Sequence, residues 1–207
     1  MTVAAAPAPV PLRRYAVLVA LSLACGALLA GAAALTRPAI ERQQAERLEA
    51  ALTRVLPEAT RFEPRGAGEP AAVFAGRTAD GRLAGYALRG AAMGYADRIE
   101  VLYGWDPERA VVTGLVVLDQ RETPGLGSRI RDDAAFHASI RGLPLALAED
   151  RRTLRTPVAL ADRRGGNGAG RIDGITGATI SSVAVARAIE DSAARWLPEL
   201  VVGEEAP

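Results

Sequence analysis

An uncharged apolar segment, Tyr15–Leu35, constrains this chain more than any other feature. As an α-helix it would be about 31 Å long, enough to cross the hydrocarbon core of a bilayer. Basic residues flank both ends, at Arg13, Arg14 and Arg37, so their distribution gives only a weak orientation signal. The short preceding segment and the long following domain favour an N-terminus in the cytoplasm. We therefore expect a single-pass anchor and a domain outside the cytoplasm.

Two other uses of this segment stay open. A cleaved signal peptide normally has an apolar core of about 7 to 15 residues, shorter than this run, so an uncleaved anchor is favoured. A lipoprotein signal would carry its lipid on Cys25, but Ser22 stands where an aliphatic residue is normally found. We assign residues 1–14 to a cytoplasmic tail and residues 15–36 to a transmembrane anchor.

The composition excludes several classes of function. The 207 residues have a formal net charge of +1, which argues against a nucleic-acid-binding face. All 25 basic residues are Arg, so the chain has neither a Schiff-base lysine nor a Walker lysine. One Cys and one His, His137, leave no disulfide, no Cys/His metal site and no Cys-ligated iron–sulfur cluster. We assign His137 no role, and any electron transfer would need an organic cofactor.

Residues 37–57 are predicted to form an amphipathic connecting helix that Pro57 ends. Its apolar face consists of Leu48, Leu52, Val55 and Leu56. The Gly- and Pro-rich segment Glu63–Pro70 is predicted to be a loop.

The remainder, within residues 58–207, has the pattern of one α+β domain with a twisted, mainly antiparallel sheet flanked by helices. The predicted strands are Ala72–Ala75, Leu83–Leu88, Ile99–Trp105 and Val111–Leu118. Ala79–Gly81 and Asp106–Arg109 are typical of hairpin turns. Helices are expected at Asp132–Arg141 and from about Ser181 to Trp196.

The segment Asp173–Ser182 reads Asp-Gly-Ile-Thr-Gly-Ala-Thr-Ile-Ser-Ser and carries the strongest functional signal. Thr179 places a hydroxyl behind the small pair Gly177 and Ala178, with the Asp173 carboxylate upstream and a predicted helix downstream. An exposed hydroxyl at this position could be esterified, and the helix would offer N–H groups to a bound phosphate. The alternative is a Gly-containing turn whose Thr or Ser caps a helix.

This segment resembles the flavinylation motif, Asp-x-x-Ser/Thr-Gly-Ala-Thr, of FMN-binding domains in the G subunit of Rnf complexes and the C subunit of sodium-pumping NADH:quinone oxidoreductases. In those families a flavin transferase moves FMN from FAD onto the last Thr through a phosphoester bond. The resemblance implies covalent FMN on Thr179 and a role for Asp173 in presenting the acceptor to the transferase. The other cofactor-binding positions expected here are Thr176, Gly177, Ala178, Ser181 and Ser182.

A second motif, Glu122-Thr123-Pro124-Gly125-Leu126-Gly127, resembles a signature of the same families. Its Pro fixes the turn, its Gly residues let the backbone approach a flat ring, and Leu126 can lie against that ring. A plain Pro-Gly turn after a strand is the alternative. The expected cofactor contacts are Glu122, Thr123, Gly125, Leu126 and Gly127. Gln120, Ser128 and Ser181 depart from the residues frequent in the families, which are His, Asp and Thr.

A third Gly-rich stretch, Arg163–Arg171, matches neither a dinucleotide fingerprint nor a P-loop, so we expect a hairpin or surface loop whose arginines are available to a phosphate.

The resemblance implies an electron-transfer subunit of a bacterial inner-membrane complex that couples electron transfer between ferredoxin and NAD to ion movement. Its FMN-binding domain would be periplasmic. The implied partners are integral membrane and iron–sulfur subunits, with a flavin transferase during maturation and no nucleic acid. Small residues of the anchor suit close packing against a partner helix. A free-standing extracytoplasmic flavoprotein reductase and a non-redox adaptor with unmodified Thr179 are the alternatives.

Overall fold

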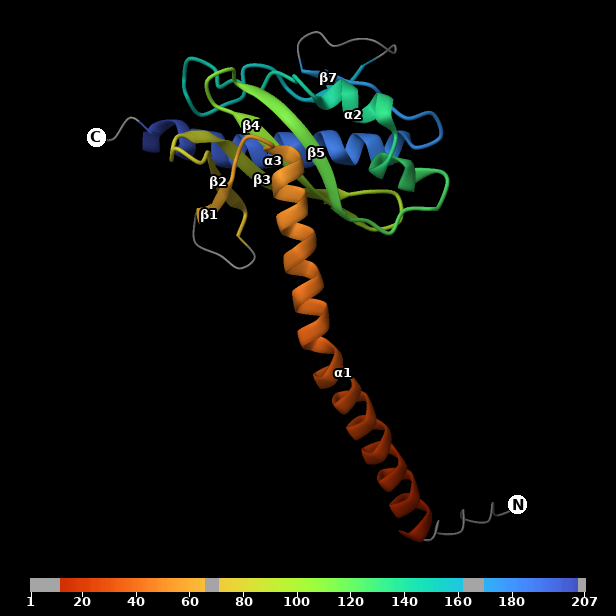
Figure 1. Ribbon diagram of the computed structural model, residues 1–207. Helices are drawn as coiled ribbons and strands as arrows, with labels where there is room; N and C mark the ends of the chain where they lie inside the picture. Colours follow the sequence, from red (N-terminus) through yellow and green to blue (C-terminus); the bar gives the residue numbers. More distant parts are fainter. Residues whose placement is uncertain (1–11, 66–70, 162–169, 205–207) are drawn as a thin grey trace. The chain divides into compact units, whose positions relative to one another are not determined.

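The computed structural model describes residues 12–65, 71–161 and 170–204 (Figure 1). Contacts divide the chain into two compact units, Met1–Arg47 and Leu48–Pro207. The first unit is helical where it is described, and the second contains a five-stranded sheet with helices. The α+β class predicted from the sequence is therefore confirmed.

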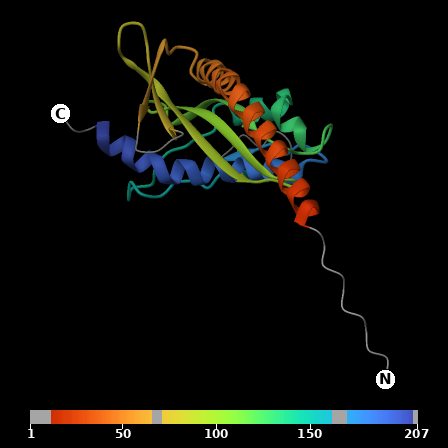
Figure 2. The ribbon, with the colours of Figure 1, turned by 90° about the horizontal axis from the view of Figure 1, so that it is seen from below.

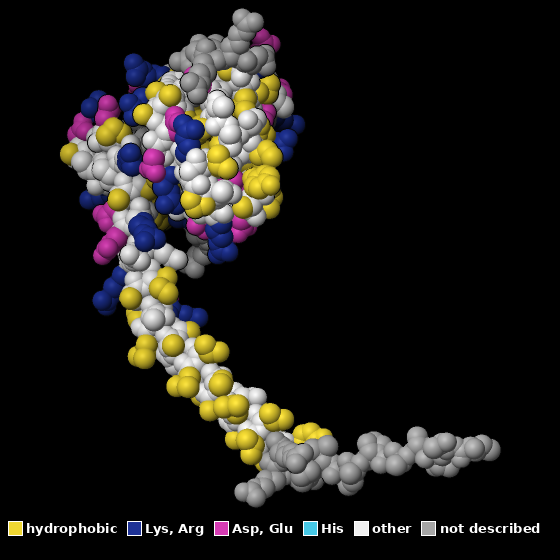
Figure 3. Space-filling model, turned by 90° about the vertical axis from the view of Figure 1, so that its right-hand side faces the viewer, with side chains coloured by type: hydrophobic (Ala, Val, Ile, Leu, Met, Phe, Trp, Pro, Cys, Tyr) yellow, Lys and Arg dark blue, Asp and Glu magenta, His cyan; other side chains and the backbone are white. Residues whose placement is uncertain are grey.

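The N-terminal helix α1 extends over Leu12–Val55, so the predicted anchor and connecting helix form one element. Pro38 lies inside this helix and does not end it. Among the described residues, α1 is the one helix long and apolar enough to cross a membrane. Apolar side chains stand out from this part of the helix in Figure 3, and Leu28, Leu29 and Leu35 are each more than 70% exposed. Such a surface requires a lipid or protein neighbour.

The sheet is an antiparallel meander in the order β1-β2-β3-β4-β5. Its strands are β1 Arg61–Arg65, β2 Val73–Arg77, β3 Leu83–Met93, β4 Arg98–Asp106 and β5 Val111–Asp119. The four predicted strands and both hairpin turns are confirmed, although β3 extends five residues beyond its predicted end at Leu88.

The prediction of a loop from Glu63 to Pro70 was wrong in its first part, because β1 includes Glu63, Pro64 and Arg65. β1 is the edge strand of the sheet, and a proline that donates no hydrogen bond is tolerated there. Residues 66–70 lie outside the described residues.

Each face of the sheet has its own apolar core. On one face, Leu88 and Tyr103 pack with Ile189 of α3 (Thr179–Glu204). On the other face, Ala87 and Leu102 pack with the C-terminal end of α1. Figure 2 shows α3 running across the sheet. The sheet thus fixes the position of α3, whose first residue is Thr179.

The end of α1 is tied directly to the sheet. The Thr113 hydroxyl donates a hydrogen bond of 2.5 Å to the carbonyl of Val55, one of the last carbonyls of the helix, which lack partners within it. Pro57 follows after the helix has ended, as expected from the sequence.

Short elements connect β5 to α3. They are the 3-10 helix η1 (Gly127–Arg131), the helix α2 (Ala134–Ile140) and the parallel pair β6 (Ala159–Leu160) and β7 (Arg171–Ile172). The predicted helix at Asp132–Arg141 is confirmed as α2, which begins after Asp133 because the Asp133 carboxylate accepts a hydrogen bond from the N–H of Phe136. The predicted C-terminal helix is also confirmed, but it starts two residues earlier and continues through Pro198.

Candidate functional site

The two motifs meet at one cavity of about 490 Å³, a size typical of ligand pockets. One wall comes from the segment after β5, a second from the N-terminus of α3, and a third from the β3–β4 hairpin. The lining residues are Tyr95, Glu122, Thr123, Leu126, Gly127, Gly177, Ala178, Thr179, Ile180 and Ser181. The walls are far apart in the sequence, and the fold joins them.

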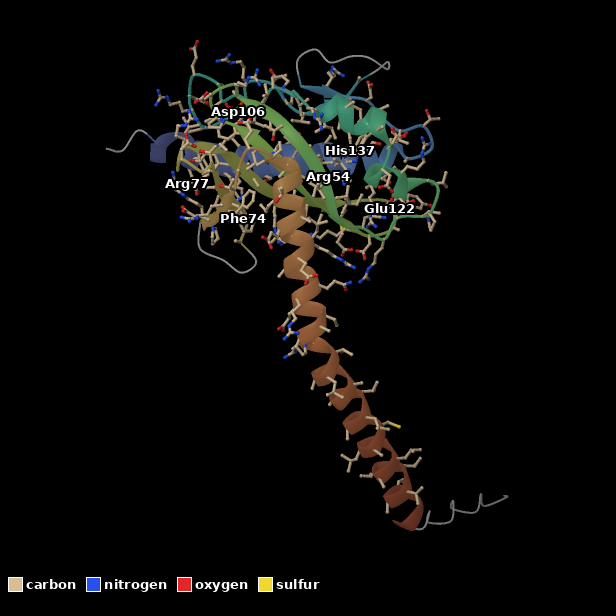
Figure 4. The ribbon with its side chains drawn as sticks, in the orientation of Figure 1. Arg54, Phe74, Arg77, Asp106, Glu122 and His137 are labelled. Atoms are coloured by element: carbon tan, nitrogen blue, oxygen red, sulfur yellow. The ribbon has the colours of Figure 1, made fainter. Side chains whose placement is uncertain are left out.

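Glu122 holds the three walls together and is only 5% exposed. Its Oε2 accepts a hydrogen bond of 2.5 Å from the Ser181 hydroxyl, and its Oε1 accepts one of 3.0 Å from the N–H of Ala96. Figure 4 labels Glu122 beyond the end of β5. A single buried carboxylate therefore connects α3, the β3–β4 hairpin and the segment after β5.

The surroundings of Glu122 keep it ionised. Burial on its own would raise the pKa of this carboxyl group, because a low dielectric disfavours the charged form. Hydrogen bonds to the carboxylate outweigh burial and hold the pKa below its ordinary value. The donors are the Ser181 hydroxyl and the backbone N–H groups of Ala96, Asp97 and Tyr95. Among the described residues that line the cavity, Glu122 has the one acidic or basic side chain.

Two glycines of the motifs are required by geometry. A Cβ on Gly127 would lie 2.5 Å from Glu122 Oε2 and 2.6 Å from Ser181 Oγ, so this position has no room for a side chain. Gly177 has a φ of +84°, a conformation that favours glycine. The turn before Thr179 thus depends on Gly177, and the Glu122–Ser181 hydrogen bond depends on Gly127.

Ser182 acts as a clasp beneath the turn formed by residues 175–178, which we name the acceptor turn because it precedes Thr179, the acceptor predicted from the sequence. It is fully buried, and its hydroxyl donates to the Ala178 carbonyl at 3.0 Å while it accepts from the N–H of Ile175 at 3.1 Å. The turn is closed further by a hydrogen bond of 2.9 Å from the N–H of Ala178 to the carbonyl of Ile175. The clasp leaves Thr179 exposed at the first position of α3.

Four of the predicted cofactor positions lie outside the cavity lining. Gly125 and Thr176 are exposed, and the Thr176 carbonyl accepts a hydrogen bond of 3.5 Å from the Arg129 guanidinium. Asp173 is half-buried, and its N–H donates to Ser139 Oγ at 3.0 Å. Ser182 is the fourth. The cavity therefore unites eight of the twelve predicted positions.

Exposed apolar side chains concentrate at this cavity. Among the residues described from Leu48 onward, the exposed large apolar side chains are Met93, Tyr95, Leu126 and Ile180. Three of them line the cavity. An apolar surface gathered at a cavity mouth is typical of a ligand site.

Tyr95, Ile180 and Arg129 were missed by sequence reasoning. Tyr95 belongs to a hairpin turn with no motif, and its role depends on the hydrogen bond between Ala96 and Glu122. A Met-Gly-Tyr turn that exposes two apolar side chains between strands was the available signal. Arg129 pairs with Asp133 at 2.7 Å beside the acceptor turn, which only the fold reveals.

The third Gly-rich stretch lies mostly outside the described residues, including Arg163 and Arg164. Arg171 is described, and its guanidinium donates to the Leu160 carbonyl at 3.0 Å.

His137 lies 2.9 Å from the Ile130 carbonyl and edge-on to Phe136. Figure 4 labels His137 on α2. Within the described part of the chain, no cluster of three His, Cys, Asp or Glu side chains is placed to hold a metal ion.

Comparison with known proteins places these features in a family context. Residues 94–194 match the FMN-binding domain model, a span that contains the whole cavity lining. The G subunit of the ion-translocating oxidoreductase complex of Methanosarcina acetivorans is 30% identical over 182 residues, covering 84% of this chain and 88% of the relative. The protein of the same name from Pasteurella multocida is 32% identical over 199 residues, covering 90% and 94%.

The fold also has a solved counterpart. The C subunit of the Na(+)-translocating NADH-quinone reductase from Parabacteroides distasonis aligns with a TM-score of 0.52 at 23% identity, covering 62% of this chain and 61% of that one. At this identity the likeness concerns the fold alone.

Proposed function

The chain belongs to the G-subunit family of ion-translocating oxidoreductase complexes, which has an FMN-binding domain, and we propose that it relays electrons through FMN attached to Thr179 by a phosphoester bond. One observation carries the proposal. Thr179 is exposed at the N-terminus of α3 and on the wall of a cavity that both motifs line.

The residues present fit a flavin mononucleotide. Leu126 and Ile180 are each about half exposed at the cavity and offer apolar surface to a planar ring system. Thr123 offers a hydroxyl to the polar edge of such a ring. The first backbone N–H groups of α3 lack partners within the helix, and their positive end is directed at a phosphate on Thr179. When bound, FMN supplies electron-transfer chemistry that no side chain of this chain offers.

Attachment needs a hydroxyl that an enzyme can reach. In the proposed reaction the Thr179 oxygen forms a bond to the phosphorus of the FMN half of FAD, the bond to the AMP half breaks, AMP leaves, and the hydroxyl proton is released. The clasp made by Ser182 holds the turn, while the small residues Gly177 and Ala178 leave the hydroxyl open. We propose that Asp173 contributes by presenting this turn to the flavin transferase.

For electron transfer through FMN, the protein must hold and orient the cofactor. Covalent attachment prevents loss of the flavin by diffusion in an extracytoplasmic compartment, because it replaces a dissociation equilibrium with a fixed local concentration. We place the FMN-binding domain, residues 58–207, in the periplasm, with residues 15–36 as the anchor, residues 37–57 as its connection and residues 1–14 in the cytoplasm. The proposed electron-transfer route lies between ferredoxin and NAD, through integral membrane and iron–sulfur partner subunits.

Covalent attachment is tested by denaturing electrophoresis. The full chain is expressed with a flavin transferase, denatured in detergent and illuminated in the gel, where only covalently held flavin migrates with the protein. We expect a fluorescent band for the wild type and none for Thr179→Val, which keeps the side-chain shape without the hydroxyl. A fluorescent Thr179→Val band would exclude Thr179 as the acceptor.

Complex membership and location need a separate experiment. A C-terminally tagged chain should co-purify with the integral membrane subunits of its complex, and its tag should be cleaved by protease added to spheroplasts. A flavin-bearing chain that purifies alone would favour the free-standing reductase. A chain without flavin in cells that contain the transferase would favour the adaptor.

A further inference from the structure

The turn between β3 and β4 lies outside both motifs, yet it supplies one wall of the cavity. Gly94 and Asp97 close this turn through a hydrogen bond of 2.9 Å from the N–H of Gly94 to the carbonyl of Asp97. Tyr95 lies within it, lines the cavity and is 72% exposed. No motif of the chain assigns a role to this tyrosine.

The backbone on either side of Tyr95 is held against the segment after β5. The N–H of Ala96 donates to Glu122 Oε1 at 3.0 Å, and the Arg121 guanidinium lies 3.5 Å from Asp97 Oδ2. A Cβ on Gly94 would lie 2.5 Å from Glu122 Oε1, so the turn and this carboxylate are in direct contact. Tyr95 is therefore an exposed side chain on a backbone that is held in place by hydrogen bonds and an ion pair.

An exposed aromatic ring on a turn that is held in place is suited to contact another molecule. Tyr95 has no stacking partner among the described aromatic side chains, whereas the buried Tyr86 stacks on Trp105 with 6.1 Å between ring centroids. Its neighbours at the cavity are the exposed apolar side chains of Leu126 and Ile180. Planar rings favour contact with other planar rings, in offset-stacked or edge-to-face arrangements.

We propose that the phenol ring of Tyr95 lies against the isoalloxazine ring of the FMN and fixes its orientation in the cavity. This inference rests on the proposed function, because it needs flavin on Thr179. Tyr95 is then a positioning residue: the phosphoester fixes one end of the cofactor, and the β3–β4 turn contacts the other. Glu122 connects the two, through Ser181 on α3 and Ala96 on the turn.

The test compares three variants of the full flavinylated chain in detergent. Tyr95→Ser removes the ring, and Tyr95→Phe keeps the ring and loses the hydroxyl. Met93→Ser alters a similarly exposed side chain of the same hairpin that lies outside the cavity lining. Flavin fluorescence yield and visible circular dichroism are measured per mole of covalent flavin. A phenol in contact with the oxidised flavin quenches its fluorescence, and a fixed ring orientation induces dichroism.

We expect Tyr95→Ser to raise the fluorescence yield at least twofold and to reduce the visible dichroism by at least half. Tyr95→Phe should keep the wild-type dichroism, and Met93→Ser should match the wild type in both signals. Wild-type signals in a flavinylated Tyr95→Ser variant would overturn the inference, as would an equal change in Met93→Ser. Absence of flavin from the wild type would instead contradict the proposed function, so the two failures are distinguishable.

Discussion

The Ser181 hydroxyl donates a hydrogen bond of 2.5 Å to Glu122 Oε2, which joins the N-terminus of α3 to the segment after β5. The two residues are 59 positions apart in the sequence and both are at least 95% buried. Through this contact the acceptor turn and the Gly-rich turn become walls of one cavity. The geometry of the site therefore depends on the carboxylate of Glu122.

Glu122→Ala should lower the free energy of unfolding by on the order of 3 kcal/mol, because it leaves the Ser181 hydroxyl and the Ala96 N–H without their acceptor. Urea unfolding in detergent measures this through the fluorescence of the two Trp residues. The control Glu149→Ala removes an exposed carboxylate and should change little. Equal unfolding midpoints for the two variants would show that Glu122 does not stabilise the domain.

The stability should also depend on pH through Glu122. Its folded pKa lies below the value in the unfolded chain, about 4.3. Its contribution is therefore fully present above about pH 4.3 and is lost as the pH falls through the folded pKa. Asp80, Asp133 and Asp150 also have lowered pKa values, so the wild type should be compared with Glu122→Gln.

The free energy difference between the wild type and Glu122→Gln should shrink between about pH 6 and about pH 3, because protonation removes the charge that Gln already lacks. Urea unfolding of both proteins at the two pH values measures this difference in the free energy of unfolding. A difference that is constant or grows on acidification would contradict the lowered pKa.

Gly127→Ala should disrupt the cavity, because its Cβ would meet the two buried atoms that form the Glu122–Ser181 hydrogen bond. We expect a loss of about 1 to 3 kcal/mol in stability, typical of overpacking, with less flavin per chain. Gly114→Ala is the matched control, since its Cβ would make only ordinary contacts at 3.7 Å or more. If both variants bind flavin and unfold like the wild type, the close approach at Gly127 is not needed.

Ser182→Ala should loosen the acceptor turn, although Ser182 itself is not one of the residues that line the cavity. The Ile175 N–H loses its acceptor, so its amide should exchange with deuterium at least tenfold faster. Hydrogen exchange read by mass spectrometry measures this. Ser181→Ala is the comparison, because it removes the neighbouring hydroxyl and leaves the Ile175 hydrogen bond in place. Unchanged exchange at Ile175 in Ser182→Ala would rule out the clasp.

The sequence predicted much of this fold, and the exceptions have physical causes. Periodicity and turn residues located four of the five main strands and the helix Ala134–Ile140. β1 was missed because Pro64 suggests a loop, although an edge strand tolerates it. The predicted anchor and connecting helix form the single element α1, which continues through Pro38.

The site was predictable where residues are adjacent in the sequence. Local motifs singled out Thr179 and Glu122, which the structure places at one cavity, because small residues and turns are local features. No motif marks Tyr95 or Arg129, since their positions at the site follow from contacts made after the sheet forms, such as the Ala96–Glu122 hydrogen bond. Ser182, which was predicted to contact the cofactor, lies beneath the turn and outside the cavity lining.

The covalent attachment of FMN to Thr179 can be read from the mass of a single peptide. The full chain is purified from cells that contain a flavin transferase and is digested with a protease. The mass of the peptide that contains Thr179 is then measured by mass spectrometry. We predict a gain of roughly 438 Da, the mass of FMN joined through a phosphoester. The same gain should occur in Thr53→Val, an exposed position on α1, and be absent from Thr179→Val. An unmodified Thr179 peptide from the wild type, or the same gain on another residue, would show that Thr179 is not the flavin acceptor.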